Sequence, residues 1–220
     1  MVDRDLVDGM MIRQRSFDDC EACRTGKERK PAAKKKLGRE IERKNQVIFA
    51  DLLFPEPKKA TGNQKPVLVI IDGYTRYTTV YPLKSKEASE VNPAMQRYIE
   101  WTDRPFPDFD VKKVITDGGR EFTKEKMTKW YRKKGIESLP TLSKSSHLNP
   151  CERVHQTLVH MLKAMLSAAG LPMSFWMHAL KMAVYVRNRS YHQTLKTTPY
   201  HMMNGKKPDM HRIKKFGSIA

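Results

Sequence analysis

An aspartate stands inside an apolar, β-branched run, and this placement constrains the fold more than any other feature of the chain. Asp51 lies within Val47-Ile-Phe-Ala-Asp-Leu-Leu-Phe54, a pattern that predicts a strand. A lone buried carboxylate is costly, so the position indicates a functional acid. A second acid, Asp117, ends another apolar run that begins at Val114, and a third, Glu152, opens a long helical pattern.

Two strands and a helix start can bring three acids from distant positions to one point. Carboxylate oxygens are the ligands that hard divalent cations prefer, and Mg²⁺ binds few protein oxygens. The sequence therefore predicts that Asp51, Asp117 and Glu152 hold divalent ions.

The remaining apolar patterns predict an alternating order of strands and helices. Strands are expected at 47–54, 67–71, 77–81, 111–116 and 136–139, and helices at 87–101, 123–134, 150–169 and 173–189. The first three strands form an antiparallel meander in this reading. The order predicts an RNase-H-like α/β fold, a mixed five-stranded sheet flanked by helices.

The charge balance indicates a nucleic-acid partner. The chain has 42 Lys and Arg against 24 Asp and Glu, a net charge of +18, and phosphate neutralisation by such a protein releases counterions. Residues 1–45 are polar and basic, and we interpret them as an arm; residues 46–220 form the core with a C-terminal helical extension.

Other classes of protein are disfavoured by the sequence. No apolar stretch approaches the roughly 18–20 residues of a membrane span, and the first residues lack an apolar signal region, so we expect neither membrane insertion nor secretion. Three cysteines, with Cys151 far from Cys20 and Cys23, make no disulfide framework.

Several motifs together resemble the integrase of copia-type LTR retrotransposons, which is related to retroviral integrases. They include Asp117-Gly-Gly-Arg-Glu-Phe122, Gly135-Ile136 and Glu152-Arg-Val-His-Gln-Thr-Leu158. Further matches are Tyr74-Thr-Arg-Tyr77, Val80-Tyr-Pro-Leu83, Leu171-Pro172 with Phe175-Trp176, Asn188-Arg-Ser190, Thr198-Pro-Tyr200, Gly205-Lys-Lys-Pro208 and Phe216-Gly217. The similarity runs from about Asp18 to the end of the chain. Departures from the family pattern are a Leu148-Asn-Pro-Cys151 loop without glycine, and His155 and Gln156 after Glu152-Arg153.

The resemblance implies a function and a set of partners. The family carries out 3′-end processing and strand transfer with Mg²⁺ or Mn²⁺, so its catalytic and metal-binding acids correspond to Asp51, Asp117 and Glu152. DNA ends and target DNA are the expected partners, together with further copies of the chain, in the nucleus or the cytoplasm; no small-molecule substrate is expected. Cys20 and Cys23 look like the end of the family's preceding zinc segment, and their zinc site lacks ligands within this chain.

Each candidate residue also has a structural interpretation. Asp117 could shape its Gly-Gly turn, and Glu152 fits the third position of a capping box with Asn149 as N-cap. Asp72 before Gly73 indicates a turn, with Arg76 as a possible partner. Cys151 fits a small packing residue better than a ligand or nucleophile.

The basic residues are also open to two readings. Arg153, Gln156, His160 and Lys163 either contact DNA or form a solvated helix face. Lys34, Lys35 and Lys36 are candidates for DNA contact or a nuclear signal.

Two other functions remain open at this point. The chain could be a DNA-binding or assembly module derived from an integrase, with weakened catalysis. It could also be an RNase-H-like nuclease, which would use the same kind of metal site.

Overall fold

The computed structural model describes residues 41–55, 65–117, 119, 122, 125–140, 150–211 and 213–218. These residues form two compact units, divided between residues 155 and 156. The predictions on Cys20, Cys23, Lys34, Lys35 and Lys36 fall outside the described residues.

The first unit contains a five-stranded sheet with strand order β3-β2-β1-β4-β5. Its strands are β1 (Val47–Leu53), β2 (Val67–Asp72), β3 (Thr78–Pro82), β4 (Lys113–Thr116) and β5 (Glu137–Pro140). The first three strands pair antiparallel, whereas β4 pairs in parallel with β1 and with β5. The predicted meander and the mixed sheet are confirmed.

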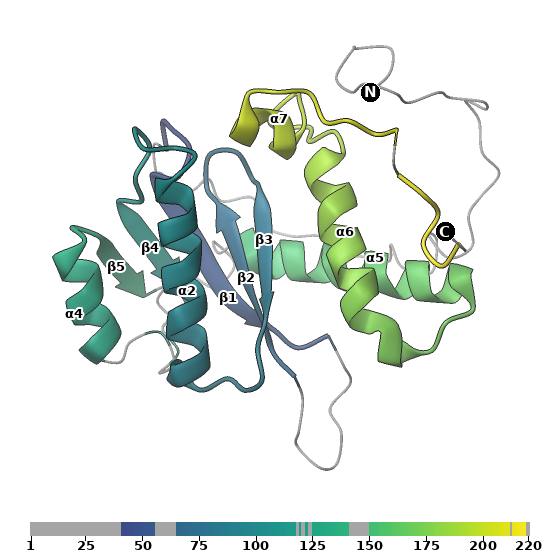
Figure 1. Ribbon diagram of the computed structural model, residues 1–220, viewed down its shortest axis with the longest axis horizontal. Helices are drawn as coiled ribbons and strands as arrows, with labels where there is room; N and C mark the ends of the chain where they lie inside the picture. The colour runs from purple at the N-terminus through teal and green to yellow at the C-terminus, as the bar shows by residue number, and fades with distance from the viewer. Residues whose placement is uncertain are drawn as a thin grey trace, which may run out of the picture. The chain divides into compact units, whose positions relative to one another are not determined.

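Two helices cover one face of this sheet. Figure 1 shows α2 (Ala88–Asp103) across the strands and α4 (Glu125–Lys133) near β5. Their buried stripes, which include Met95, Tyr98 and Met127, join Ile48 and Ala50 of β1 in one apolar core. Successive strand residues point to opposite faces, so the odd-numbered residues of β1, including Asp51, face away from this core.

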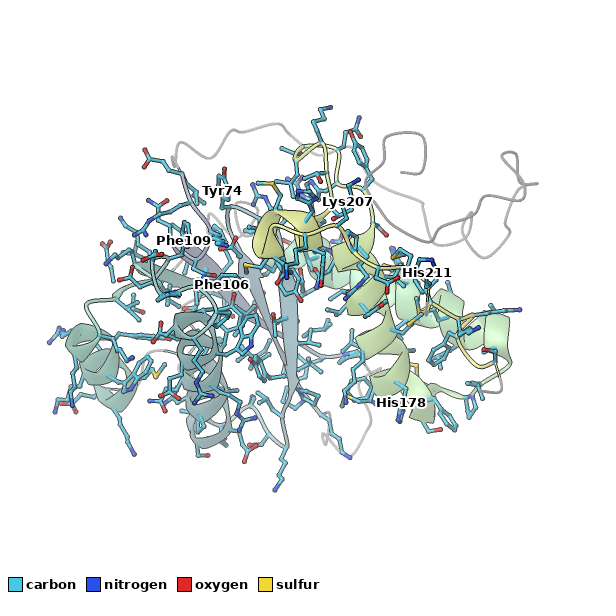
Figure 2. All side chains as sticks on the ribbon, turned by 45° about the horizontal axis from the view of Figure 1, so that its top comes forward. Tyr74, Phe106, Phe109, His178, Lys207 and His211 are labelled. Carbon is cyan, nitrogen blue, oxygen red and sulfur yellow. The ribbon has the colours of Figure 1, made fainter. Side chains whose placement is uncertain are left out.

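The segment before β1 is packed onto the first unit. Lys44 places its ammonium 4.1 Å from the ring centre of Phe106 and 4.7 Å from that of Phe109, both labelled in Figure 2. Arg43 donates to the carbonyl of Asp108 at 2.8 Å, and Asn45 is fully buried. The folded unit therefore includes residues just before the strand, whereas the predicted boundary between residues 45 and 46 stays a prediction.

Helices make up the second unit. The helix α5 (Pro150–Ala169) begins in the first unit and continues here, followed by η3 (Met173–Phe175), α6 (Trp176–Arg189) and α7 (Pro199–Asn204). The predicted stop after Ala169 is confirmed, since Gly170 has a φ of 63° and Leu171 donates to the carbonyl of Leu166 at 3.0 Å. In the described part of the chain, no helix is long and apolar enough to cross a bilayer.

The sequence reading did not include α7. Thr198 caps this helix by accepting a hydrogen bond from the backbone N–H of His201 at 3.1 Å, and Gly205 ends it in the left-handed conformation. The Arg189 guanidinium lies 3.6 Å from the ring centre of Tyr185 and 4.5 Å from that of Tyr200. This cation–π contact ties α6 to α7.

Candidate functional site

Asp51 and Asp117 occupy equivalent positions on neighbouring parallel strands. The β1–β4 register pairs Phe49 with Ile115 and Ala50 with Thr116, so the next position on each chain is one of the two acids. Parallel neighbours lie about 4.8 Å apart. The sheet therefore brings the two acidic positions together at the carboxyl end of the β1–β4 pair.

The two acids also belong to the same face of the sheet. Ala50 and Val114 lie in the core beneath α2, and side-chain direction alternates along a strand. Asp51 follows Ala50 directly, and Asp117 continues the alternation from Ile115. Both positions thus lie on the face opposite to α2 and α4.

The Asp51 carboxylate is mostly buried, with a side chain 20% exposed. One oxygen, Oδ1, accepts a hydrogen bond from the backbone N–H of Leu52 at 2.8 Å. The other, Oδ2, lies 3.9 Å from Nδ1 of His155 in α5. The predicted strand position of Asp51 is confirmed, and His155 is a neighbour that the sequence reading did not assign to the site.

His155 is an inward-facing imidazole on the first part of α5. Its side chain is 14% exposed, and burial lowers the pKa of the imidazole to about 4, so the ring is neutral at physiological pH. Its Nε2 is buried and has no hydrogen-bond partner within the described residues. The signal for it was its place one helical turn after Glu152, because residues three apart are neighbours on a helix surface.

Asp117 is exposed and takes part in the turn that follows β4. Its Oδ1 accepts a hydrogen bond from the backbone N–H of Gly119 at 3.0 Å. This contact matches the turn-shaping interpretation of Asp117.

Glu152 lies exposed in the first turn of α5. A carboxylate is stabilised at this end of a helix by the unpaired backbone N–H groups. Pro150 begins the helix, which suits a residue without an N–H. The capping-box alternative involves Asn149, which lies outside the described residues.

The carboxylates of Asp51, Asp117 and Glu152 are ligands of the kind that binds a divalent cation, although they do not converge on one point. Within the described part of the chain, no group of three His, Cys, Asp or Glu side chains could hold one metal ion. Hydrogen bonds to Leu52 and Gly119 engage Oδ1 of Asp51 and Oδ1 of Asp117, respectively. Carboxylate oxygens are nevertheless the kind of ligand that a hard divalent cation prefers.

Asp72 has a structural role, as its place before Gly73 predicts. The side chain is fully buried and accepts hydrogen bonds from the backbone N–H groups of Asn45 and Thr75, both at 2.7 Å, and from the Thr75 hydroxyl at 2.6 Å. The expected link to Arg76 is electrostatic: burial lowers the pKa of the Arg76 guanidinium, and the Asp72 charge opposes this shift.

The predicted polar face of α5 is exposed. All four candidates lie on it: Arg153, Gln156, His160 and Lys163. Cys151 forms no disulfide with the described residues and its thiol is fully buried, as expected for a packing residue. The face is accessible to a partner such as DNA, whereas Cys151 is not.

Comparison with known proteins gives a consistent set of similarities. Residues 41–143 match the integrase core domain family. The chain is 27% identical over 203 residues to the "Retrovirus-related Pol polyprotein from transposon TNT 1-94" of Nicotiana tabacum, covering 91% of the chain and 15% of that protein. It is also 28% identical over 195 residues to "Gypsy retrotransposon integrase-like protein 1" of Homo sapiens, covering 87% of the chain and 35% of that protein. The chain thus spans only a minor part of these relatives.

Solved structures show the same fold. The HTLV-2 integrase catalytic core domain in complex with magnesium superimposes with a TM-score of 0.54 at 14% identity, over 74% of this chain and 98% of that one. A chain of the simian T-cell lymphotropic virus intasome in complex with PP2A regulatory subunit B56 gamma gives 0.63 at 16% identity, over 89% and 67%. The predicted RNase-H-like fold is confirmed.

Proposed function

We propose that the chain is a polynucleotidyl transferase acting on DNA, because residues 41–143 match the integrase core domain family. Its reactions are 3′-end processing, with water as the nucleophile, and strand transfer, with a DNA 3′-hydroxyl as the nucleophile. The substrates are the ends of an element and a target duplex.

The observation that carries this proposal is the β1–β4 register. It puts Asp51 and Asp117 at the same level of adjacent strands and on the same face of the sheet. Glu152 lies one turn before His155, which is 3.9 Å from Asp51. The start of α5, which carries Glu152, is therefore a neighbour of Asp51.

We assign Asp51, Asp117 and Glu152 as the residues that would hold Mg²⁺ or Mn²⁺. Bound divalent ions would supply charge stabilisation to the attacking and leaving oxygens of the phosphate. The chain's own part is to orient these carboxylates. The strands β1 and β4 fix the backbone positions of Asp51 and Asp117, and α5 carries Glu152. Asp51 is the most constrained of them, because it is mostly buried and held by Leu52.

DNA contact is proposed for the exposed side of α5. Arg153 and Lys163 present positive charge there, and Gln156 and His160 present hydrogen-bonding groups. Phosphate contacts of this kind position a duplex without reading its sequence. The net charge of +18 supports the same partner.

A second candidate function is a DNA-binding or assembly module without efficient catalysis. Two observations favour it. No set of three ligands converges within the described residues, and the Asp117 carboxylate accepts a hydrogen bond within the turn that follows β4. A hydrolytic nuclease of the RNase-H-like class is a third outcome of the same experiment.

A strand-transfer assay with a pre-processed DNA end separates these functions. We expect metal-dependent joining by the unaltered chain, and loss of joining in Asp51→Asn, Asp117→Asn and Glu152→Gln, because each change removes an anionic ligand at nearly constant volume. Glu125→Gln is a matched control, since Glu125 is an exposed acid in the first turn of α4. It should keep full activity.

Other results would redirect the assignment. DNA binding without joining in the unaltered chain would favour the assembly module, and cleavage without joining would favour the nuclease. Joining that persists in one of the three variants at unchanged Mg²⁺ would remove that residue from the site.

Assembly and location complete the proposal. We propose that several copies of the chain act together in the nucleus, where target DNA lies, and that zinc binds Cys20 and Cys23 only with ligands from outside this chain. Light scattering at increasing protein concentration, with and without DNA ends, tests the oligomer.

A further inference from the structure

We propose that residues 205–218, which we call the C-terminal basic segment, bind the phosphate backbone of duplex DNA. These residues are different from those of the exposed face of α5, to which DNA contact is assigned above. The inference rests on the proposed function for the identity of the partner, DNA. It concerns binding alone, and it requires neither a metal ion nor a chemical step.

The charge of the last part of the chain is strongly one-sided. Residues 156–220 contain ten Lys and Arg and one acidic residue, Asp209, and five of the ten lie in the basic segment together with Asp209. The Asp209 carboxylate is engaged by His211, labelled in Figure 2. Its Oδ1 accepts a hydrogen bond from the His211 backbone N–H at 2.9 Å and lies 2.8 Å from Nδ1 of the ring. A polyanion is the kind of partner that such a surface fits.

The lysines of the segment are accessible to this partner. Lys206, Lys214 and Lys215 are exposed, and none of the three has an ion-pair partner among the residues that the structure describes. On α4, by contrast, Lys129 places its Nζ 2.7 Å from Oε1 of Glu125. Contact between the three lysines and DNA phosphates would therefore break no ion pair within the described residues.

The segment is held on the helical unit at both of its ends. At its start, Gly205 ends α7 with a φ of 69°, and the side chain of Met210 is buried. At its end, Gly217 lies against α5, since an added Cβ atom would be 2.6 Å from Cβ of Ala169. Figure 1 shows the chain running from α7 toward the end of α5. The backbone that carries the lysines is thus fixed by contacts within the unit, which lowers the entropy cost of binding.

A duplex fits this segment better than a single strand does. Proteins that bind single strands without sequence preference offer aromatic rings on which bases stack. Phe216 is the only Phe, Tyr or Trp of the segment, and it is half-buried. Lysine ammonium groups act as point charges on phosphates, and such contacts position a duplex without reading its sequence. We therefore expect salt-sensitive binding of a duplex of any sequence.

The test is fluorescence anisotropy of a labelled DNA duplex with the full chain, over a salt series and without divalent metal. The test variant replaces by glutamine the three exposed lysines of the segment: Lys206, Lys214 and Lys215. The slope of log affinity against log salt should fall by about 0.9 for each phosphate contact that is lost. The control makes the same change at three exposed lysines of α4: Lys126, Lys129 and Lys133. Its slope should stay nearly unchanged.

A second variant disturbs the attachment of the segment without changing its charge. In Gly217→Ala the new methyl group would collide with Ala169, so the end of the segment must shift and duplex affinity should fall. Gly170→Ala is the matched control, because its φ of 63° is similarly unfavourable for alanine but an added Cβ meets nothing within 4 Å. Equal affinity of these two variants would overturn the role assigned to the contact with Ala169.

The outcomes separate this inference from the proposed function. Equal slopes of the two triple variants would overturn the inference even if the chain joins DNA ends, and would leave an acidic protein surface as the partner of the segment. A lower slope in the segment variant alone supports the inference, and if joining is then absent, only the proposed activity fails. An equal loss of affinity for single-stranded DNA would overturn the assignment of a duplex.

Discussion

A single buried carboxylate, Asp72, fixes the turn between β2 and β3. It is fully buried and accepts three hydrogen bonds, one from Asn45 and two from Thr75. Asn45 has a φ of 62°, a left-handed conformation that asparagine tolerates better than most residues. Asp72 therefore holds together a turn and the segment before β1 that are far apart in sequence.

The stability contribution of Asp72 should depend on pH in a defined direction. Burial raises the pKa of its carboxyl above the ordinary value of 3.8, and the hydrogen bonds from Thr75 and Asn45 oppose this rise. Because the pKa is higher in the folded state, the protonated Asp72 side chain favours folding more than the ionised one does. This stabilisation is fully present below pH 3.8 and is lost as the pH rises through the folded-state pKa.

Urea unfolding of the wild type and Asp72→Asn across pH 3–8 tests this expectation. The variant places an amide N–H₂ group near donors that need an acceptor, so it should be less stable by about 1–3 kcal/mol. The wild-type advantage should be largest at acidic pH and should shrink as the pH rises. An advantage that grows with pH would contradict the raised pKa.

At the scale of elements, the turn after β2 approaches the start of β1 closely at Gly73. Its N–H donates to the carbonyl of Val47 at 2.8 Å. A Cβ atom there would lie 2.8 Å from Cδ1 of Ile41, 2.9 Å from the carbonyl oxygen of Val47 and 3.1 Å from Cε2 of Phe49. The β2–β3 turn can therefore pack against the start of β1 only with glycine at this position.

Gly73→Ala should consequently destabilise the first unit by about 1–3 kcal/mol through overpacking. Gly135→Ala is the matched control: its added Cβ would meet nothing within 4 Å, but its φ of 69° is unfavourable for alanine, at a cost of about 1–2 kcal/mol. Thermal melting should show a larger loss for Gly73→Ala. A smaller loss would mean that the backbone at Val47 shifts to accommodate the added methyl group.

At the scale of the whole molecule, the basic arm should determine how DNA binding responds to salt. Residues 1–40 carry most of the early basic cluster. The deletion should stop at residue 40 because Arg43, Lys44 and Asn45 are packed on the first unit. Its removal should flatten the dependence of log affinity on log salt, with a loss of slope of about 0.9 for each phosphate contact.

Two triple variants with the same charge change refine this test. Replacement of Lys34, Lys35 and Lys36 by glutamine should lower the slope, whereas the same replacement of Lys126, Lys129 and Lys133 on α4 should leave it nearly unchanged. Fluorescence anisotropy over a salt series measures both slopes. Equal slopes would show that DNA responds to net charge rather than to the arm.

The sequence predicted the sheet well because its strands are apolar runs of the expected length, such as Val67–Asp72. It did not predict α7, whose six residues are too few for a periodic pattern, although Thr198, Pro199 and Gly205 carry start and stop signals. Asp51 stood out as an acid in an apolar strand. Its contact with His155 joins positions far apart in the chain, and no local pattern encodes such a contact.

The parallel pairing of β1 with β4 also has a consequence for a chain that is still being synthesised. Asp51 emerges from the ribosome early, but the meander and α2 must follow before β4 can take its place beside β1. Such non-local pairing is slow to form. A nascent or truncated chain that ends before β4 therefore lacks the paired acids, so the proposed site can form only after β4 has been made.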